Sequence, residues 1–422
     1  ATATAVEMGS PKLSTVLAEQ WASCPAPDDE TRSALLTVLG RVGKPMAETL
    51  PPVATACAAL GPAKTPWLGG LSDTGCAWLQ ACRPLAKLVM PGSAHDARAA
   101  LSPLSHHTTT LVGGPTTSTS SSSGALAQKL EGIGLAALIV AGVEGGPRGV
   151  AARALSLQRF AREQRHRAGP DQLEAALDLE RLALTRISAL LVRGAVGGVQ
   201  ARALLNDLHP AGEHVDQWQS LARISFVENN RQLSVTDTAL RDQLQPLPGA
   251  APNPLPAPDA GNAWPTRAWM VDQWLPAWRP LLDAPDLPYG ARRALYIAAW
   301  DRLQKGGSLP HGGAQLARLA PLDLAAQATD AATCSLRLGL HLAQLPPDAR
   351  RVDTTTETIV EVLGPGCGRD PVLGGPWTVQ DTGDGIAIEA ASTDLNRAAR
   401  LGLKDDLRGM IGLRLRDELL VQ

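Results

Sequence analysis

A turn near the C-terminus, at residues 369–377, constrains the fold more than any other stretch of this chain. Pro371 fixes its own φ and disfavours a helical conformation at Asp370. Gly374 and Gly375 give the backbone the freedom that a turn needs, and Pro376 ends the turn. A helix therefore cannot run through this stretch, and the chain must reverse or bend here.

Strand patterns follow the turn. Residues 377–380 and 385–389 alternate in polarity, and the glycines and aspartates between them are typical of a hairpin connection. A third alternating segment lies at 411–416, after a longer crossover at 394–409. Since a lone hairpin is marginally stable in water, we predict a small antiparallel β-meander that packs on the rest of the molecule.

The rest of the chain has the apolar periodicity of helices. The acids at 28–30 are typical of a helix start, and an apolar stripe at helical spacing follows them, made of Leu35, Leu36, Val38, Leu39 and Val42. Similar segments continue to residue 368 without a sequence repeat. We predict a mainly α fold of stacked antiparallel helical hairpins with the β-meander at its C-terminal end.

Two segments interrupt the helical pattern, the Ser/Thr-rich stretch 102–124 and the proline-rich stretch 246–265. Both compositions favour extended, solvated linkers. They divide the chain into an N-terminal helical region at 1–101, a central helical region at 125–245, a C-terminal helical region at 266–368 and the meander module at 369–422.

The central region begins with a pattern of three helices between residues 125 and 194. The middle one is rich in arginine, and the next one starts with acids after a turn at Gly169-Pro170. We interpret this pair as an antiparallel hairpin with complementary charged flanks and a shared apolar seam. A nucleic-acid surface would need interleaved aromatic residues, and Phe160 is the one that the basic helix contains.

Composition narrows the class of protein. The formal net charge of −2, with 44% hydrophobic and 19% charged residues, is typical of a globular protein and gives no global attraction to nucleic acid. The longest apolar stretch, 132–143, is shorter than the ~18 residues that a spanning helix needs. We therefore expect a buried helix there and no transmembrane segment.

The C-terminal motifs carry a resemblance. "DPVLGGP" followed by "TGDGIAIE" resembles the end of a family of uncharacterised exported or membrane-anchored helical proteins of planctomycetes and myxobacteria, and the turn is also similar to the C-terminal loop of type II secretion pseudopilins. The segment at 25–32 is similar to the family's segment after its membrane anchor. Trp377 and Val379 depart from the Leu and Tyr that the family prefers. The resemblance implies an exported location (periplasm, cell envelope or extracellular) and no activity.

The chain has six cysteines, an even number that permits three disulfides in an exported protein. Cys76 and Cys82 lie too far apart along one predicted helix to pair with each other. We favour a bridge between Cys334 and Cys367, which would tie a helix to the entry of the C-terminal turn. The alternative is six reduced, buried cysteines.

One cluster has the residue types of a catalytic or metal site: His209, Glu213, His214 and Asp216. Two histidines and two carboxylates can hold a divalent cation, or pair a base with an orienting acid. The spacing differs from that of a metalloprotease helix. The favoured interpretation is therefore a loop and a helix N-terminus whose acids stabilise the first turn.

Tryptophans recur after the proline-rich linker, at Trp269, Trp274 and Trp278. Trp274 and Trp278 share a helix face, so the group could form an aromatic platform that binds a sugar or a partner. Buried packing between lobes is the interpretation that we favour.

These observations leave three hypotheses of function. We favour a non-catalytic exported or cell-envelope helical scaffold that binds a protein partner or self-assembles, with no cofactor. A metal-assisted hydrolase would use His209, Glu213, His214 and Asp216. A filament or virion subunit would use the linkers as arms and the edge of the C-terminal sheet for assembly.

Overall fold

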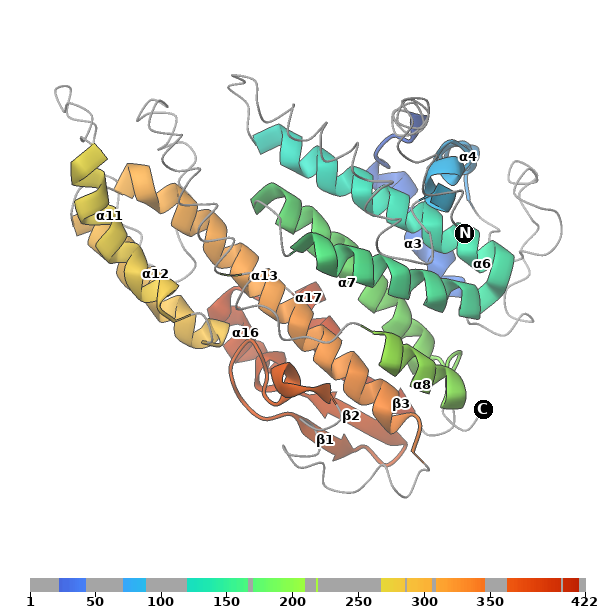
Figure 1. Ribbon diagram of the computed structural model, residues 1–422. Coiled ribbons are helices and arrows are strands. Elements are labelled where there is room, and N and C mark those ends of the chain that lie inside the picture. The colour runs from blue at the N-terminus through green and yellow to red at the C-terminus, as the bar shows by residue number, and fades with distance from the viewer. Residues whose placement is uncertain are drawn as a thin grey trace, which may run out of the picture.

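The computed structural model describes residues 23–42, 71–88, 120–165, 170–208, 218, 267–284, 287–305, 309–345, 363–403 and 405–416. It is mainly helical, with one three-stranded antiparallel sheet near the C-terminus, so the predicted fold class is confirmed (Figure 1). The helices are α3 (Asp29–Arg41), α4 (Asp73–Leu88), α6 (Ser120–Arg165), α7 (Pro170–Val192), α8 (Gly198–Asp207), α11 (Arg267–Leu282), α12 (Tyr289–Lys305), α13 (Leu309–Leu342), α16 (Leu395–Leu401) and α17 (Asp405–Ile411). The strands are β1 (Thr378–Asp381), β2 (Gly385–Glu389) and β3 (Leu413–Arg416).

Helix α3 begins where the acidic segment predicts it. The Asp28 carboxylate accepts a hydrogen bond of 2.7 Å from the backbone N–H of Thr31, which satisfies one of the free donors of the first turn. At the other end, the Arg193 guanidinium donates to the carbonyl oxygens of Gly40 and Val42. The side chain of the residue that directly follows α7 therefore caps the C-terminus of α3.

Helices α6 and α7 form the long central hairpin. Gly146 leaves the helical conformation at φ 59° and ψ −147°, directly before Pro147, so α6 has two segments and the region holds three helical stretches, as predicted. Helix α6 starts at Ser120, which lies inside the predicted linker 102–124. Serine is well suited to a helix N-terminus, so the end of the Ser/Thr run is helical. Residues 102–119 lie outside the described residues.

The first part of α6 contains a long apolar stretch. The stretch Ala127–Arg162 is long and apolar enough to cross a membrane, because it contains an 18-residue window with a mean hydropathy of 1.3, but 61% of that window is buried inside the protein. It packs against α7 and α4. The contact with α7 is close, because a Cβ on Gly134 would lie 2.6 Å from Leu179 Cδ1. This stretch is therefore placed as a core helix, which agrees with the sequence-based expectation.

Helix α13 is the centre of the molecule. Figure 1 shows it between α7 on one side and α12 on the other, and it also contacts α8, α17 and the sheet. Helices α11 and α12 form the next hairpin outward. Each of these elements therefore packs on α13, either directly or through one neighbouring element.

The sheet has the order β1-β2-β3, and both pairs are antiparallel. Four side chains point to the helical body and are buried: Ile386, Ile388, Leu413 and Leu415. Strands β2 and β3 contact α13, and the approach is close, since a Cβ on Gly339 would lie 2.4 Å from Leu413 Cδ2. The predicted meander on a helical body is present, and its crossover contains α16 and α17.

Candidate functional site

The turn that the sequence singled out is built around the buried side chain of Asp370. One carboxylate oxygen accepts a hydrogen bond of 2.9 Å from the backbone N–H of Val372, and the other accepts one of 3.0 Å from Ser392. Gly374 adopts a φ of 74°, which glycine reaches without steric strain. Burial raises the pKa of Asp370, although the hydrogen bonds to its carboxylate oppose that shift. Asp370 therefore fixes the turn to the start of the crossover.

The turn also reaches the outer hairpin. The backbone N–H of Gly290, in the first turn of α12, donates a hydrogen bond of 2.8 Å to the carbonyl oxygen of Val372. The N–H of Tyr289 donates one of 2.6 Å to the side-chain oxygen of Gln327 in α13. A Cβ on Gly290 would lie 2.8 Å from Leu373 Cδ2, so the backbones approach closely. The C-terminal module is thus held by α12 as well as by α13.

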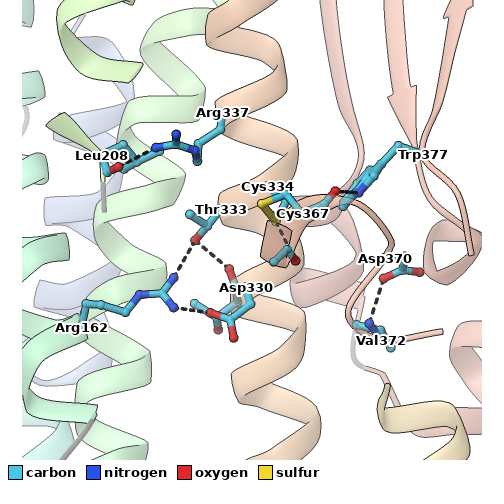
Figure 2. The surroundings of a disulfide bond; sticks show 12 residues. Arg162, Leu208, Asp330, Thr333, Cys334, Arg337, Cys367, Asp370, Val372 and Trp377 are labelled. Atoms are coloured by element: carbon cyan, nitrogen blue, oxygen red, sulfur yellow. Dashed lines mark hydrogen bonds and ion pairs between the residues drawn. A yellow bond between two sulfur atoms is a disulfide. The ribbon is translucent and has the colours of Figure 1, made fainter. Parts of the chain in front are cut away.

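A disulfide joins the same module to α13. The sulfur atoms of Cys334 and Cys367 lie 2.00 Å apart, and this is the pair that the sequence favoured. The indole N–H of Trp377 donates a hydrogen bond of 3.0 Å to the carbonyl oxygen of Cys367 (Figure 2). A second bridge joins Cys24 and Cys82, before α3 and within α4, and Cys76 is disulfide-bonded as well.

A cleft of about 750 Å³ lies between the helical body and the C-terminal module. One wall comes from α7 and α13, and the other comes from the ends of β2 and β3, the start of the crossover and α17. Its lining residues are Leu184, Thr185, Ser188, Ala189, Val192, Arg193, Ala332, Leu336, Ile388, Glu389, Ala390, Thr393, Asp394, Arg408, Gly409, Met410, Gly412, Leu413 and Arg414. The size falls in the range typical of small-molecule sites.

Charges of both signs line this cleft. The Asp394 carboxylate already accepts a hydrogen bond of 2.9 Å from the backbone N–H of Arg397, which caps α16. Arg408 lies 3.3 Å from the exposed carboxylate of Asp405, and its Nε is buried without a hydrogen-bond partner among the described residues. Arg408 is therefore a cation with an unused buried donor at the wall of the cleft.

A separate group of charges is buried between α6, α7 and α13. Arg165 lies 2.7 Å from Glu180 and 3.0 Å from Asp330, and Arg162 contacts the same two acids. Figure 2 shows the contact between Arg162 and Asp330. Burial alone would lower the pKa of Arg165, but the charges of Asp330 and Glu180 raise it above its usual value. The charges of the two arginines and the two acids balance, so this group holds the three helices together. The predicted pairing of the hairpin is present, but Arg162, Arg165 and Glu180 are buried instead of lying on solvated flanks.

A second buried group joins α12 to α13. Asp323 accepts hydrogen bonds of 2.7 Å from Arg292 and 3.3 Å from the Tyr296 hydroxyl. Burial raises the pKa of Asp323, while Arg292 opposes the shift. Trp218 stacks on Tyr296 at 6.5 Å between ring centroids, and the Arg292 guanidinium lies 5.3 Å from the Trp218 ring. The charges of Asp323 and Arg292 therefore pair with each other inside the protein.

The residues proposed from sequence as catalytic or metal-binding candidates, His209, Glu213, His214 and Asp216, lie outside the described residues. Within the part of the chain that the structure describes, no three His, Cys, Asp or Glu side chains are grouped to hold a metal ion.

The tryptophans of α11 are described in part. Trp269 and Trp274 belong to the helix, but their side chains lie outside the described part of the structure. Trp278 has none of its surface exposed, so it packs in the core and forms no part of an open platform. The burial concerns Trp278 alone, and the roles of Trp269 and Trp274 stay predictions.

Sequence reasoning did not find the cleft. Its residues come from positions 184–193, 332–336, 388–394 and 408–414, and each segment has an ordinary helix or strand pattern. Only the packing of α7 and α13 on the C-terminal module brings them together. Comparisons of the chain with protein-family models, with curated proteins and with solved structures gave no match.

Proposed function

We propose that this chain is a non-catalytic, exported helical binding protein, and that its ligand or partner occupies the cleft between α7, α13 and the C-terminal module. The helical body acts as the scaffold, and the module closes one side of the site. This assigns the protein a location outside the cytoplasm and a binding role.

The buried disulfides carry the proposal. A chain of 422 residues can bury a large core, so it does not need bridges for lack of apolar surface. Cys24, Cys82, Cys334 and Cys367 are nevertheless paired and fully buried. Structural disulfides form and persist mainly in oxidising compartments, which supports export.

The use of the buried charges supports a binding role over a catalytic one. An acid or base that takes part in chemistry needs access to a substrate. Glu180 and Asp330 are compensated by Arg162 and Arg165 in the core, and Asp370 accepts backbone hydrogen bonds within its turn. The strongly buried acids of these groups therefore serve the fold, and the cleft is left with exposed and half-buried polar groups.

Fractionation with thiol trapping tests the proposal. Cells that make the protein are separated into cytoplasmic and extracytoplasmic fractions in the presence of a maleimide. The protein is then unfolded in denaturant with more maleimide, so that buried free thiols also react, and is analysed by peptide mass mapping. We expect the protein outside the cytoplasm, with Cys24–Cys82 and Cys334–Cys367 recovered as linked peptides. Recovery in the cytoplasm with maleimide on these four cysteines would overturn the proposal.

A further inference from the structure

We infer that the cleft binds a linear aliphatic molecule with a single negative charge, such as an alkyl carboxylate. This inference rests on the proposed function, because it names the ligand class of the same cleft. It follows from the apolar side chains of the lining, from the partly exposed guanidinium of Arg408 and from the balance of charges around the cleft.

The apolar part of the lining favours a flexible chain. Its large side chains are aliphatic or thioether groups: Leu184, Val192, Leu336, Ile388, Met410 and Leu413. Among the described residues, no aromatic side chain belongs to the lining, so an aromatic ligand would find no ring of this part of the chain to stack on. A volume of about 750 Å³ accommodates an alkyl chain of moderate length.

The position of the anion follows from Arg408. Arg193 also lines the cleft, but it donates to the carbonyl oxygens at the end of α3. Arg408 has one exposed partner, Asp405, and a buried Nε without an acceptor among the described residues. The Arg408 side chain is 28% exposed and lines the cleft, and a carboxylate fits the planar donor fork of its guanidinium.

The charge balance limits the ligand to one negative charge. In the described part of the lining there are three arginines, at 193, 408 and 414, and two acids, Glu389 and Asp394. Asp394 is used as the cap of α16, whereas Glu389 sits at the end of β2 beside the cleft. Glu389 would repel a second negative charge, so a carboxylate is favoured over a phosphate dianion.

Calorimetric titration of the full-length oxidised protein tests this inference. The probes are decanoate, 1-decanol, decyl phosphate and decyltrimethylammonium, which share a chain length and differ in their head groups. We expect decanoate to bind at least about tenfold more tightly than decanol or decyltrimethylammonium, because a charge-assisted hydrogen bond is gained. Decyl phosphate is expected to bind more weakly than decanoate.

Three variants and one control show where the charged head group and the alkyl chain of the ligand bind. Arg408→Gln is expected to weaken decanoate about tenfold and leave decanol unchanged, and Glu389→Gln to strengthen decanoate. Arg397→Gln is the matched control, since Arg397 is exposed on α16 outside the lining. Gly409→Trp is expected to block both probes. Since a Cβ on Gly409 would contact nothing within 4 Å, this variant should still fold.

The outcomes separate the two proposals. Equal binding of decanoate and decanol, with no effect of Arg408→Gln, would overturn the ligand class and leave the cleft as a binding site. Binding that Gly409→Trp leaves intact would place the ligand elsewhere and overturn the inference. The failure of all four probes would also overturn it. The cellular thiol test decides export independently of these titrations.

Discussion

The indole N–H of Trp377 donates to the carbonyl oxygen of Cys367, whose sulfur is bonded to Cys334 in α13. The first residue before the sheet is thus fastened to the central helix by one covalent bond and one hydrogen bond. This arrangement sets the position of β1, and β1 sets the position of β2 by the pairing of Val379 with Ile388. One wall of the cleft therefore depends on a contact that lies outside it.

The Cys334–Cys367 bridge should contribute substantially to stability. Replacing both cysteines by serine is expected to lower the free energy of unfolding by about 2–4 kcal/mol, because the unfolded chain regains the freedom of the closed loop. Urea denaturation followed by circular dichroism measures the change. Trp377→Phe keeps the bridge and removes one hydrogen bond, so a loss of about 1–2 kcal/mol is expected. An unchanged midpoint in the double serine variant would contradict the role of the bridge.

The buried charged group should respond strongly to the loss of one member. Asp330→Asn leaves Arg162 and Arg165 with a single acid between them, and a loss of about 3–5 kcal/mol is expected. Glu131→Gln is the control, since its partner Arg32 is exposed and such pairs contribute less than about 1 kcal/mol. Chemical denaturation of both variants gives the comparison. Similar small losses of unfolding free energy in the two variants would show that the group does not hold the three helices together.

The contact between α13 and the sheet should not tolerate a larger residue at position 339. Gly339→Ala would place a methyl group against Leu413 and Leu191, so a loss of about 1–3 kcal/mol is expected. Gly40→Ala is the matched control, because its Cβ meets nothing within 4 Å and alanine favours a helix by up to ~1 kcal/mol. Thermal unfolding should therefore shift in opposite directions for the two variants. A stabilising effect of Gly339→Ala would mean that the sheet lies further from α13.

Asp370 should give the stability a distinct pH dependence. Burial raises its folded-state pKa above the value of ~3.9 in an unfolded chain, so the folded state binds the proton more tightly. The contribution of this proton to stability is present below pH ~3.9 and is lost as the pH rises through the folded-state pKa. The stability difference between the wild type and Asp370→Asn should therefore decrease from pH 3 to pH 7. Urea titrations across this range test the sign, and a difference that grows with pH would refute it.

Local patterns were sufficient for α3, the C-terminal turn and the strands, whereas helices α16 and α17 in the crossover were not predicted. The acids at 28–30 gave the start of α3, and the alternation at 386, 388, 413 and 415 gave the buried face of the sheet. The turn at 370–376 was predicted because proline and glycine restrict or free the backbone at known positions. Each of these signals acts within a few residues, so the sequence displays it directly.

Long-range contacts were not predicted in the same way. Arg162 and Glu180 carry the charge pattern of solvated helix flanks, and their burial depends on Asp330, 168 positions from Arg162 along the chain. The cleft likewise depends on how α7 and α13 meet α17. No local pattern specifies how distant elements pack together, because the sequence around a helical arginine is the same whether its side chain faces water or another element.

The Cys24–Cys82 bridge has a consequence for the integrity of the molecule. A protease that cuts the chain once anywhere between these positions cannot release either piece, since the two ends stay covalently attached through sulfur. The same holds for a cut between Cys334 and Cys367. A nicked molecule would migrate as one species on a gel until a reductant is added, and its cleft would keep both walls.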